Sequence, residues 1–231
     1  MTAQTTLRPQ VVFLLDVDNT LLDNDRIVDD LKRLLTREVG RERQERYWAI
    51  FEEHRRELGY ADYLGTLQRY RLEDRRDPHL LAIASFLLNY PFRDRMYPGA
   101  FDALRHLSGW GPTVLLTDGD VVFQPLKIER TGLFDALEGR VLLYVHKEQE
   151  LDDIERRYPA DHYVLVDDKV RLLTAMKQAW GDRLTTIFPR QGHYAHDPQV
   201  AEYPRPDVTI ERIADLLNFD PPPGVPPRRT P

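Results

Sequence analysis

Short, continuous runs of apolar residues, each followed by polar or acidic residues, recur along this chain. Five such runs cover residues 11–15, 113–116, 141–145, 163–166 and 184–188. Continuous runs, rather than alternating apolar and polar positions, are typical of strands that are buried on both faces. The pattern therefore predicts five strands of a parallel sheet that helices cover on both sides.

Segments with a helical period separate these runs. The first begins at Pro98-Gly99 and ends before Gly109, and the others cover about residues 123–130, 149–157 and 170–180. Strands that alternate with helices predict an α/β fold, a Rossmann-like, doubly wound parallel sheet with right-handed crossovers. In such sheets, ligands bind at the carboxyl ends of the strands.

One long stretch, residues 24–95, breaks this alternation because it contains no convincing strand. Apolar residues recur there with a helical period, namely Tyr47, Ile50, Phe51 and Leu58, then Leu80, Ile83, Ala84 and Leu87. We interpret 24–95 as an all-helical cap inserted after the first strand, and 1–23 with 96–220 as the core domain. Residues 221–231 are dense in proline and are predicted to be a disordered tail.

Composition and charge narrow the class of protein. The 231 residues carry a net charge of −6 without a basic stripe, which gives no support to nucleic-acid binding. No apolar run approaches the roughly 20 residues needed to cross a bilayer, so no membrane association is expected. The lack of cysteine and of a visible secretion signal suits a cytoplasmic protein. Nothing in the sequence indicates an oligomeric state.

Asp16 and Asp18 follow the first apolar run and are the candidate catalytic pair. A carboxylate nucleophile that forms an acyl phosphate would divide a difficult hydrolysis into two easier steps. We assign this role to Asp16, while Asp18 would protonate the leaving oxygen and then deprotonate the attacking water. An Asp-x-Asp sequence does not decide the matter alone, because acidic pairs also cap turns and helices.

A second acidic pair, Asp167-Asp168, ends another predicted strand. Two adjacent carboxylates are costly to bury without a counter-charge, and Mg²⁺ takes oxygen ligands that it commonly shares with a substrate phosphate. The alternative is a helix N-cap before Val170, where acidic residues are also favoured. Because Asp16 and Asp18 are expected at the same edge of the sheet, the sequence favours a magnesium site.

Thr117 and Lys147, which follow two further predicted strands, are candidate phosphate-binding residues. The Thr117 hydroxyl could donate a hydrogen bond to a phosphoryl oxygen, together with the backbone amides of Asp118 and Gly119. Lys147 would neutralise the nucleophile and the phosphoryl charge. The alternative for Lys147 is a solvated surface lysine.

Taken together, these residues resemble the haloacid dehalogenase-like (HAD) hydrolase superfamily. Four signatures occur in chain order: Asp16-Val17-Asp18-Asn19-Thr20, Leu115-Leu116-Thr117, Lys147 and Val166-Asp167-Asp168. The resemblance implies a HAD core of the phosphatase type, with the insertion at 24–95 in the place of the family's helical, C1-type cap.

The resemblance also implies a role for each position. Asp16 would be the nucleophile and a metal ligand, and Asp18 would be the acid/base and offer its backbone carbonyl to Mg²⁺. Asp168 would bind the metal directly, and Asp167 would act through water. The implied activity is a Mg²⁺-dependent phosphomonoesterase that forms an aspartyl-phosphate intermediate on a small phosphorylated substrate.

The sequence departs from the family's pattern at two positions. The family's lysine is often followed by proline, but here Glu148 follows Lys147, and Lys127 is the rival candidate for that lysine. Asp118 follows Thr117 where asparagine is common.

The same fold also supports functions other than phosphate hydrolysis. Haloacid dehalogenases do not carry the second acid of the Asp16/Asp18 pair, so the resemblance argues against dehalogenation. Phosphomutases share all four signatures and stay an alternative. A non-catalytic regulatory or binding protein on the same fold is the other alternative, because fold alone does not assign function.

Two further polar groups are interpreted as surface features. Arginines of the cap could meet an anionic substrate, but runs of charge are more often solvated helix faces; they are Arg55, Arg56, Arg69, Arg75 and Arg76. His193, Tyr194 and His196 could form a second metal site, but a loop at the rim of the active site is the favoured interpretation.

Overall fold

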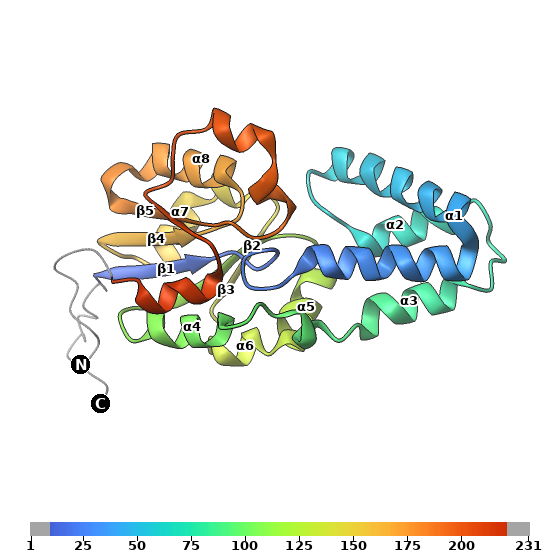
Figure 1. The fold of residues 1–231 in the computed structure, drawn as a ribbon, viewed down its shortest axis with the longest axis horizontal. Helices are drawn as coiled ribbons and strands as arrows, with labels where there is room; N and C mark the ends of the chain where they lie inside the picture. The colour runs from blue at the N-terminus through green and yellow to red at the C-terminus, as the bar shows by residue number, and fades with distance from the viewer. Residues whose placement is uncertain (1–9, 221–231) are drawn as a thin grey trace, which may run out of the picture.

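The computed structural model describes residues 10–220, so the predicted tail at 221–231 lies outside the described residues. Six parallel strands form one sheet. They are β1 (Val11–Leu15), β2 (Thr113–Asp118), β3 (Val141–Tyr144), β4 (His162–Val166), β5 (Leu184–Pro189) and β6 (Val208–Ile210) (Figure 1).

The strand order across the sheet is β3-β2-β1-β4-β5-β6. This is the order of a doubly wound Rossmann-type sheet, so the predicted α/β fold is confirmed. In register, Phe13 of the central strand β1 pairs with Thr113 of β2 and with Val164 of β4. The direction of winding reverses between β1 and β4, and ligands bind at the carboxyl ends of the strands at such a point.

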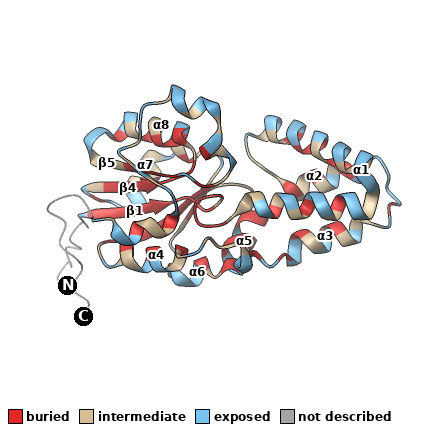
Figure 2. Ribbon diagram, viewed as in Figure 1, coloured by how far each residue is buried: buried red, intermediate tan, exposed pale blue. Residues whose placement is uncertain are grey.

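Helices cover both faces of the sheet. Along β1, Val11, Phe13 and Leu15 pack on one side, whereas Val12 and Leu14 pack on the other. The first face is covered by α4 (Ala100–Ser108), α5 (Phe123–Thr131) and α6 (Leu133–Ala136), and the second by α7 (Leu151–Arg157) and α8 (Val170–Trp180). Figure 2 shows the strands as a buried layer between these helices, as the continuous apolar runs predicted.

Short 3₁₀ helices complete the described chain. They are η1 (Phe92–Arg95), η2 (Lys147–Gln149), η3 (Gly181–Arg183), η4 (His193–His196), η5 (Pro198–Glu202) and η6 (Ile213–Asn218).

Three helices follow β1 and lie beyond the carboxyl ends of the strands (Figure 1). They are α1 (Asn24–Leu58), α2 (Tyr63–Tyr70) and α3 (Leu80–Asn89). The chain reverses direction within α1 at Gly40, whose φ of 81° and ψ of 168° are not helical and suit a residue without Cβ. The reversal brings the Lys32 ammonium to 5.3 Å from the centre of the Trp48 ring, so the two halves of α1 lie side by side.

Aromatic contacts join these helices to the core. Tyr63 of α2 and Phe92 of η1 both contact Phe123 of α5, with ring centroids 5.4 and 5.7 Å apart. Such pairs add about 0.5–1.5 kcal/mol to the gain from burying the rings. The helices of 24–89 therefore pack against α5, a helix that also contributes to the site described below.

Two elements of the core, β6 and α6, were not predicted from the sequence. β6 has only three residues, none of them buried, so it lacks the continuous apolar run that marks the other strands. α6 is a single turn of four residues, which is too short to show a period. No helix within residues 10–220 is long and apolar enough to cross a membrane.

Candidate active site

Three carboxylates meet where β1 and β4 end. Asp16 follows β1 directly, and its backbone N–H donates to the carbonyl of Val166 at the end of β4 (3.0 Å). Asp167 and Asp168 follow β4, and the chain places carboxylate oxygens of all three acids within 4.8 Å of one another. All three are buried, at 3%, 0% and 0% exposure. The reversal point of the sheet thus carries a compact acidic cluster.

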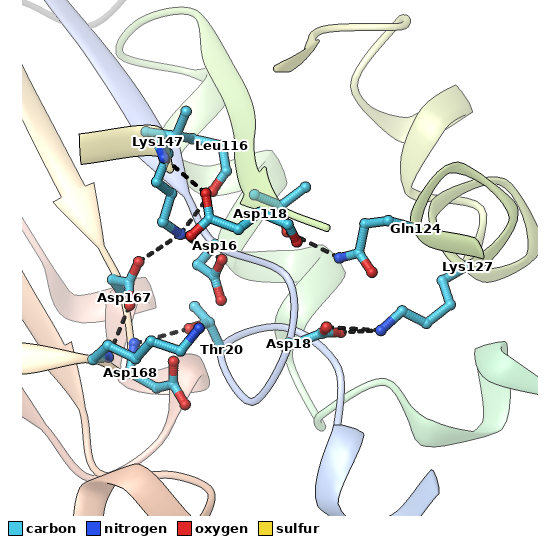
Figure 3. A network of polar contacts seen from close by, with 12 residues as sticks. Asp16, Asp18, Thr20, Leu116, Asp118, Gln124, Lys127, Lys147, Asp167 and Asp168 are labelled. Atoms are coloured by element: carbon cyan, nitrogen blue, oxygen red, sulfur yellow. Dashed lines mark hydrogen bonds and ion pairs between the residues drawn. The ribbon is translucent and has the colours of Figure 1, made fainter. Parts of the chain in front are cut away.

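Lys147 is the ammonium partner of this cluster. Its Nζ lies 2.6 Å from Asp16 Oδ1 and 2.7 Å from Asp167 Oδ2, and it donates to the backbone carbonyl of Leu116 at 3.1 Å (Figure 3). Burial alone would lower the pKa of Lys147, but the carboxylates of Asp16, Asp167 and Asp118 outweigh it and raise the pKa. The ammonium is therefore charged at neutral pH. Lys147, not its rival Lys127, contacts the predicted nucleophile.

Several oxygens of the acidic cluster have no hydrogen-bond partner. They are Asp16 Oδ2 and both carboxylate oxygens of Asp168. Buried polar atoms in folded proteins are nearly always satisfied, because leaving one unpaired costs about 1–3 kcal/mol, more for a charged group. Burial and the nearby charge of Asp167 raise the pKa of Asp168 well above its usual value. The chemistry of this donor set, oxygen atoms with excess negative charge, fits a hard divalent cation.

Asp18 has a different environment. Its carboxylate turns toward α5, away from Asp16 (Figure 3), and both oxygens accept from Lys127 Nζ, at 2.6 and 2.7 Å. Lys127 Nζ also donates to Asn24 Oδ1 at 3.1 Å. The Lys127 side chain is 1% exposed, whereas that of Asp18 is 29% exposed. In the structure, the two predicted catalytic acids therefore pair with different lysines, Asp16 with Lys147 and Asp18 with Lys127.

The predicted phosphate-binding residues of β2 already have partners within the protein. Thr117 is buried, and its hydroxyl accepts a hydrogen bond from Gln124 Nε2 at 2.9 Å. Asp118 Oδ1 accepts from the backbone N–H of Lys147 at 2.8 Å and so anchors the segment that carries this lysine. Burial raises the pKa of Asp118, although the charge of Lys147 opposes the change. An acid at this position thus has a structural partner that the sequence did not reveal.

A cavity of about 800 Å³ lies between the strand ends and the helices of 24–89. Its floor includes Asp18, Asp118, Lys127 and Lys169, and its other walls are rich in aromatic residues, which are Trp48, Phe51, Tyr60, Tyr63, Phe123, Tyr194 and Tyr203. A space of this size suits a small metabolite rather than a polymer.

The family follows from comparison with known proteins. The sequence profile of the haloacid dehalogenase-like hydrolases matches residues 11–179. The chain belongs to this family. A search of curated proteins gave no match.

Solved structures include similar HAD hydrolases. A crystal structure of a protein from Burkholderia xenovorans LB400, assigned to the same family, is 62% identical over 92% of this chain and 97% of its own, with a TM-score of 0.87. YfnB from Bacillus subtilis, a magnesium-bound protein assigned as a HAD hydrolase, is 17% identical over 91% and 98% of the two chains (TM-score 0.58). An L-2-haloacid dehalogenase from Xanthobacter autotrophicus with chloropropionic acid covalently bound is 16% identical over 90% and 96% (TM-score 0.59). At these low identities, the last two show the fold alone.

Within this HAD hydrolase, Lys169 is a charged residue of the site that was not predicted. It follows Asp168 directly and lines the cavity, with its ammonium 5.3 Å from the centre of the Tyr194 ring. Burial alone would lower the pKa of Lys169, but Asp16, Asp168 and Asp167 raise it. The sequence feature that could have identified Lys169 as a site residue is its position directly after the acidic pair at a strand end.

The loop of η4 lies at the rim of the cavity, as the favoured interpretation has it. His193 Nδ1 pairs with Asp25 Oδ1 at 2.6 Å, and Tyr194 accepts a hydrogen bond from Arg55 Nη2 at 2.6 Å. Among residues 10–220, only the Asp16 cluster brings three potential metal ligands together, so the histidines gain no support as a second metal site.

The arginines of 24–89 differ in their surroundings. Arg55 lines the cavity, whereas Arg69 pairs with Glu57 on an exposed helix face.

Proposed function

We propose that this HAD hydrolase is a Mg²⁺-dependent phosphohydrolase that transfers the phosphoryl group of a small metabolite to Asp16. The observation that carries the proposal is the set of buried, unpartnered carboxylate oxygens on Asp16 and Asp168. A cation at this point would satisfy these oxygens and balance their charge. It would also stand beside the carboxylate that is the candidate nucleophile.

Asp16 and Asp168 would hold the cation directly, with Asp167 nearby and the Asp18 backbone carbonyl as a further oxygen ligand. When bound, Mg²⁺ would neutralise charge on a phosphoryl group and orient it. Lys147 restrains one oxygen of Asp16, Oδ1. The Asp16 carboxylate, as the candidate nucleophile, would attack phosphorus with the oxygen that does not bind the cation.

In the first step, an oxygen of the Asp16 carboxylate forms a bond to phosphorus and the bond from phosphorus to the leaving oxygen breaks. The leaving oxygen takes its proton from Asp18, which lines the cavity in which a leaving group would sit. For this step Asp18 is in its protonated form, in which one oxygen carries the proton and the other keeps its contact with Lys127 Nζ. Lys147 and Lys169 bring positive charge to a step in which the phosphoryl oxygens are negative. The product of this step is an acyl phosphate on Asp16 and a free alcohol.

In the second step, water attacks the acyl phosphate. Asp18, now ionised, accepts a proton from this water as the new oxygen–phosphorus bond forms. The bond between phosphorus and Asp16 breaks, which releases inorganic phosphate and regenerates the carboxylate. A phosphomutase would instead return the phosphoryl group to a second hydroxyl of the substrate, and this stays the alternative reaction.

The test is hydrolysis of p-nitrophenyl phosphate with Mg²⁺ and with a chelator, in wild type and Asp16→Asn. We expect activity that requires Mg²⁺ and falls by on the order of 10⁴-fold or more in the variant, because the nucleophile is lost. Asp102→Asn, on the exposed face of α4, is the matched control and should keep wild-type activity.

Two further assays separate the alternatives. Chloride release from L-2-chloropropionate without phosphatase activity would replace the proposal with dehalogenation, the reaction named for the Xanthobacter neighbour. Failure to hydrolyse p-nitrophenyl phosphate or a panel of sugar and nucleoside phosphates would favour a binding protein. Full activity in Asp16→Asn would exclude the mechanism.

A further inference from the structure

Lys127 is a buried lysine that none of the family's four signatures includes. Its side chain is 1% exposed, and its Nζ lies 5.7 Å from the centre of the Phe123 ring. Burying an ammonium is costly unless it is paired and hydrogen-bonded. Within the described chain, its ion-pair partner is Asp18, the candidate acid/base.

The contacts of Lys127 define the orientation of the Asp18 carboxylate. Both oxygens of Asp18 contact one ammonium, at 2.6 and 2.7 Å, so rotation of the carboxylate or movement of its side chain would break at least one contact. The third contact goes to Asn24 Oδ1 at 3.1 Å. Because Asn24 is the first residue of α1, Lys127 links Asp18 to the point at which the chain enters the helices of 24–89.

We propose that Lys127 is a positioning residue that holds Asp18 toward the leaving-group side of the cavity and so controls protonation of the leaving oxygen. This inference rests on the proposed function and deepens it. Lys127 touches no reacting atom itself. It acts through Asp18, and its effect should therefore depend on how much the leaving group needs a proton.

Leaving groups differ in how much they need to be protonated before they depart. A p-nitrophenolate is weakly basic and departs without protonation, whereas a phenolate or p-methoxyphenolate is more basic and gains more from a general acid. The three aryl phosphates have nearly the same size, so the cavity should bind them alike. A residue that only stabilises the fold would change the rates for all three by the same factor.

The experiment measures kcat/KM for these three phosphates in wild type and Lys127→Met. We expect a fall of about 10- to 100-fold for phenyl and p-methoxyphenyl phosphate, which is less than the roughly 10²–10⁴-fold that general acid–base catalysis contributes, because Asp18 itself is retained. For p-nitrophenyl phosphate the expected fall is less than about threefold, because this leaving group needs little general-acid assistance. Lys177→Met on α8, which removes an ammonium that contacts Asp207 and the Leu184 carbonyl, should leave the dependence on leaving group unchanged.

A double-mutant cycle tests whether Lys127 acts through Asp18. Adding Lys127→Met to Asp18→Asn should lower kcat/KM no further, because residues that act as a unit are not additive. If Lys127→Met does not fold, as judged by thermal unfolding, Lys127→Gln serves instead, with the same expected change in leaving-group dependence.

The outcomes distinguish this inference from the proposed function. A wild type that hydrolyses none of the three phosphates would overturn both. An active wild type in which the lysine variant slows all three substrates equally, or slows none of them, would overturn the positioning role alone. A further loss of activity in the Asp18→Asn background would also overturn it.

Discussion

Lys147 and Lys127 are both buried lysines at the carboxyl edge of the sheet, but their surroundings carry different charge. Lys147 faces Asp16 and Asp167 directly, with Asp168 beside them. Lys127 faces a single carboxylate, that of Asp18. The first cluster sets three carboxylates against Lys147 and the neighbouring Lys169 and leaves carboxylate oxygens unpartnered, whereas the second pairs one carboxylate with one ammonium. We infer that the first is built to take a cation and the second to hold an acid in place.

The two clusters also differ in what supports them. The acids around Lys147 follow β1 and β4, neighbouring strands at the centre of the sheet, so their positions are set by the rigid core. The pair of Lys127 and Asp18 joins α5 to the loop after β1 and, through Asn24, to the start of α1. Movement of α1 would therefore reach Asp18 through Asn24 and Lys127.

Among the changes that compare the two lysines, the largest effect is expected from Lys147→Met. This change leaves Asp16 and Asp167 buried without their ammonium partner, and breaking a buried pair in this way typically costs about 3–5 kcal/mol. Urea denaturation in a chelator should show that loss of stability, and phosphatase activity should fall by on the order of 10³-fold, because both charge neutralisation and Asp16 orientation are lost. Lys177→Met is the control. An equal loss of stability in this variant would contradict the explanation that the loss comes from the buried acids Asp16 and Asp167.

The second prediction concerns the stabilisation of the fold by Mg²⁺, which should depend on the acidic cluster around Lys147 and not on the pair of Lys127 and Asp18. Mg²⁺ at a hundred times its Kd should stabilise wild type by about 2.7 kcal/mol, or roughly 5–10 °C in Tm for a chain of this size. Asp168→Asn should abolish this shift, because it removes a charged ligand. Lys127→Met should retain it, because Lys127 pairs with Asp18 and not with the acidic cluster. A shift that survives in Asp168→Asn would place the cation elsewhere.

The pH dependence of stability should also distinguish the clusters. The pKa of Asp168 is raised in the folded chain by burial and by Asp167, from an ordinary value of 3.8. The folded state therefore binds a proton more tightly than the unfolded state, and stability in a chelator should fall as pH rises above about 4.

Each carboxyl with a raised pKa lowers the free energy of unfolding by up to about 1.4 kcal/mol for every pH unit between its unfolded-state and folded-state pKa. Urea denaturation from pH 4.5 to 7.5 should show a shallower decline in Asp168→Asn than in wild type. Part of the decline should persist, because burial also raises the pKa of Asp118. Identical slopes in the two proteins would mean that Asp168 is ionised in the metal-free chain.

The sheet could be predicted from sequence because its strands are buried on both faces. Continuous apolar runs such as Val11–Leu15 are typical of such strands, and their short length, with helical segments between them, favours strands over buried helices. The exposed edge strand β6 lacks this signal, since Val208 and Ile210 are only half-buried and Thr209 is exposed. The reversal of α1 at Gly40 was hidden because both of its halves have the same helical period.

The acidic cluster could be predicted because the carboxyl ends of neighbouring parallel strands meet at one edge. The partners of each side chain could not. Lys127 lies on α5, more than a hundred residues from Asp18 in the chain, and its selection of Asp18 rather than Asp16 depends on how α5 packs. Gln124, which donates to Thr117, lies on the same helix and was missed for the same reason. Spacing along the chain carries no information about such contacts.

The smallest effect is expected from Asn24→Ala, which tests the link from α1 to the pair of Lys127 and Asp18. Lys127 would lose one of its three contacts but keep both contacts to Asp18, and a single hydrogen bond is typically worth about 0.5–1.5 kcal/mol. We therefore expect about a threefold fall in kcat/KM for phenyl phosphate and no change for p-nitrophenyl phosphate. Asn89→Ala, at the exposed end of α3, is the control and should change neither rate. If Asn24→Ala lowered activity as much as Lys127→Met, the entry of α1, rather than the ion pair, would determine where Asp18 lies.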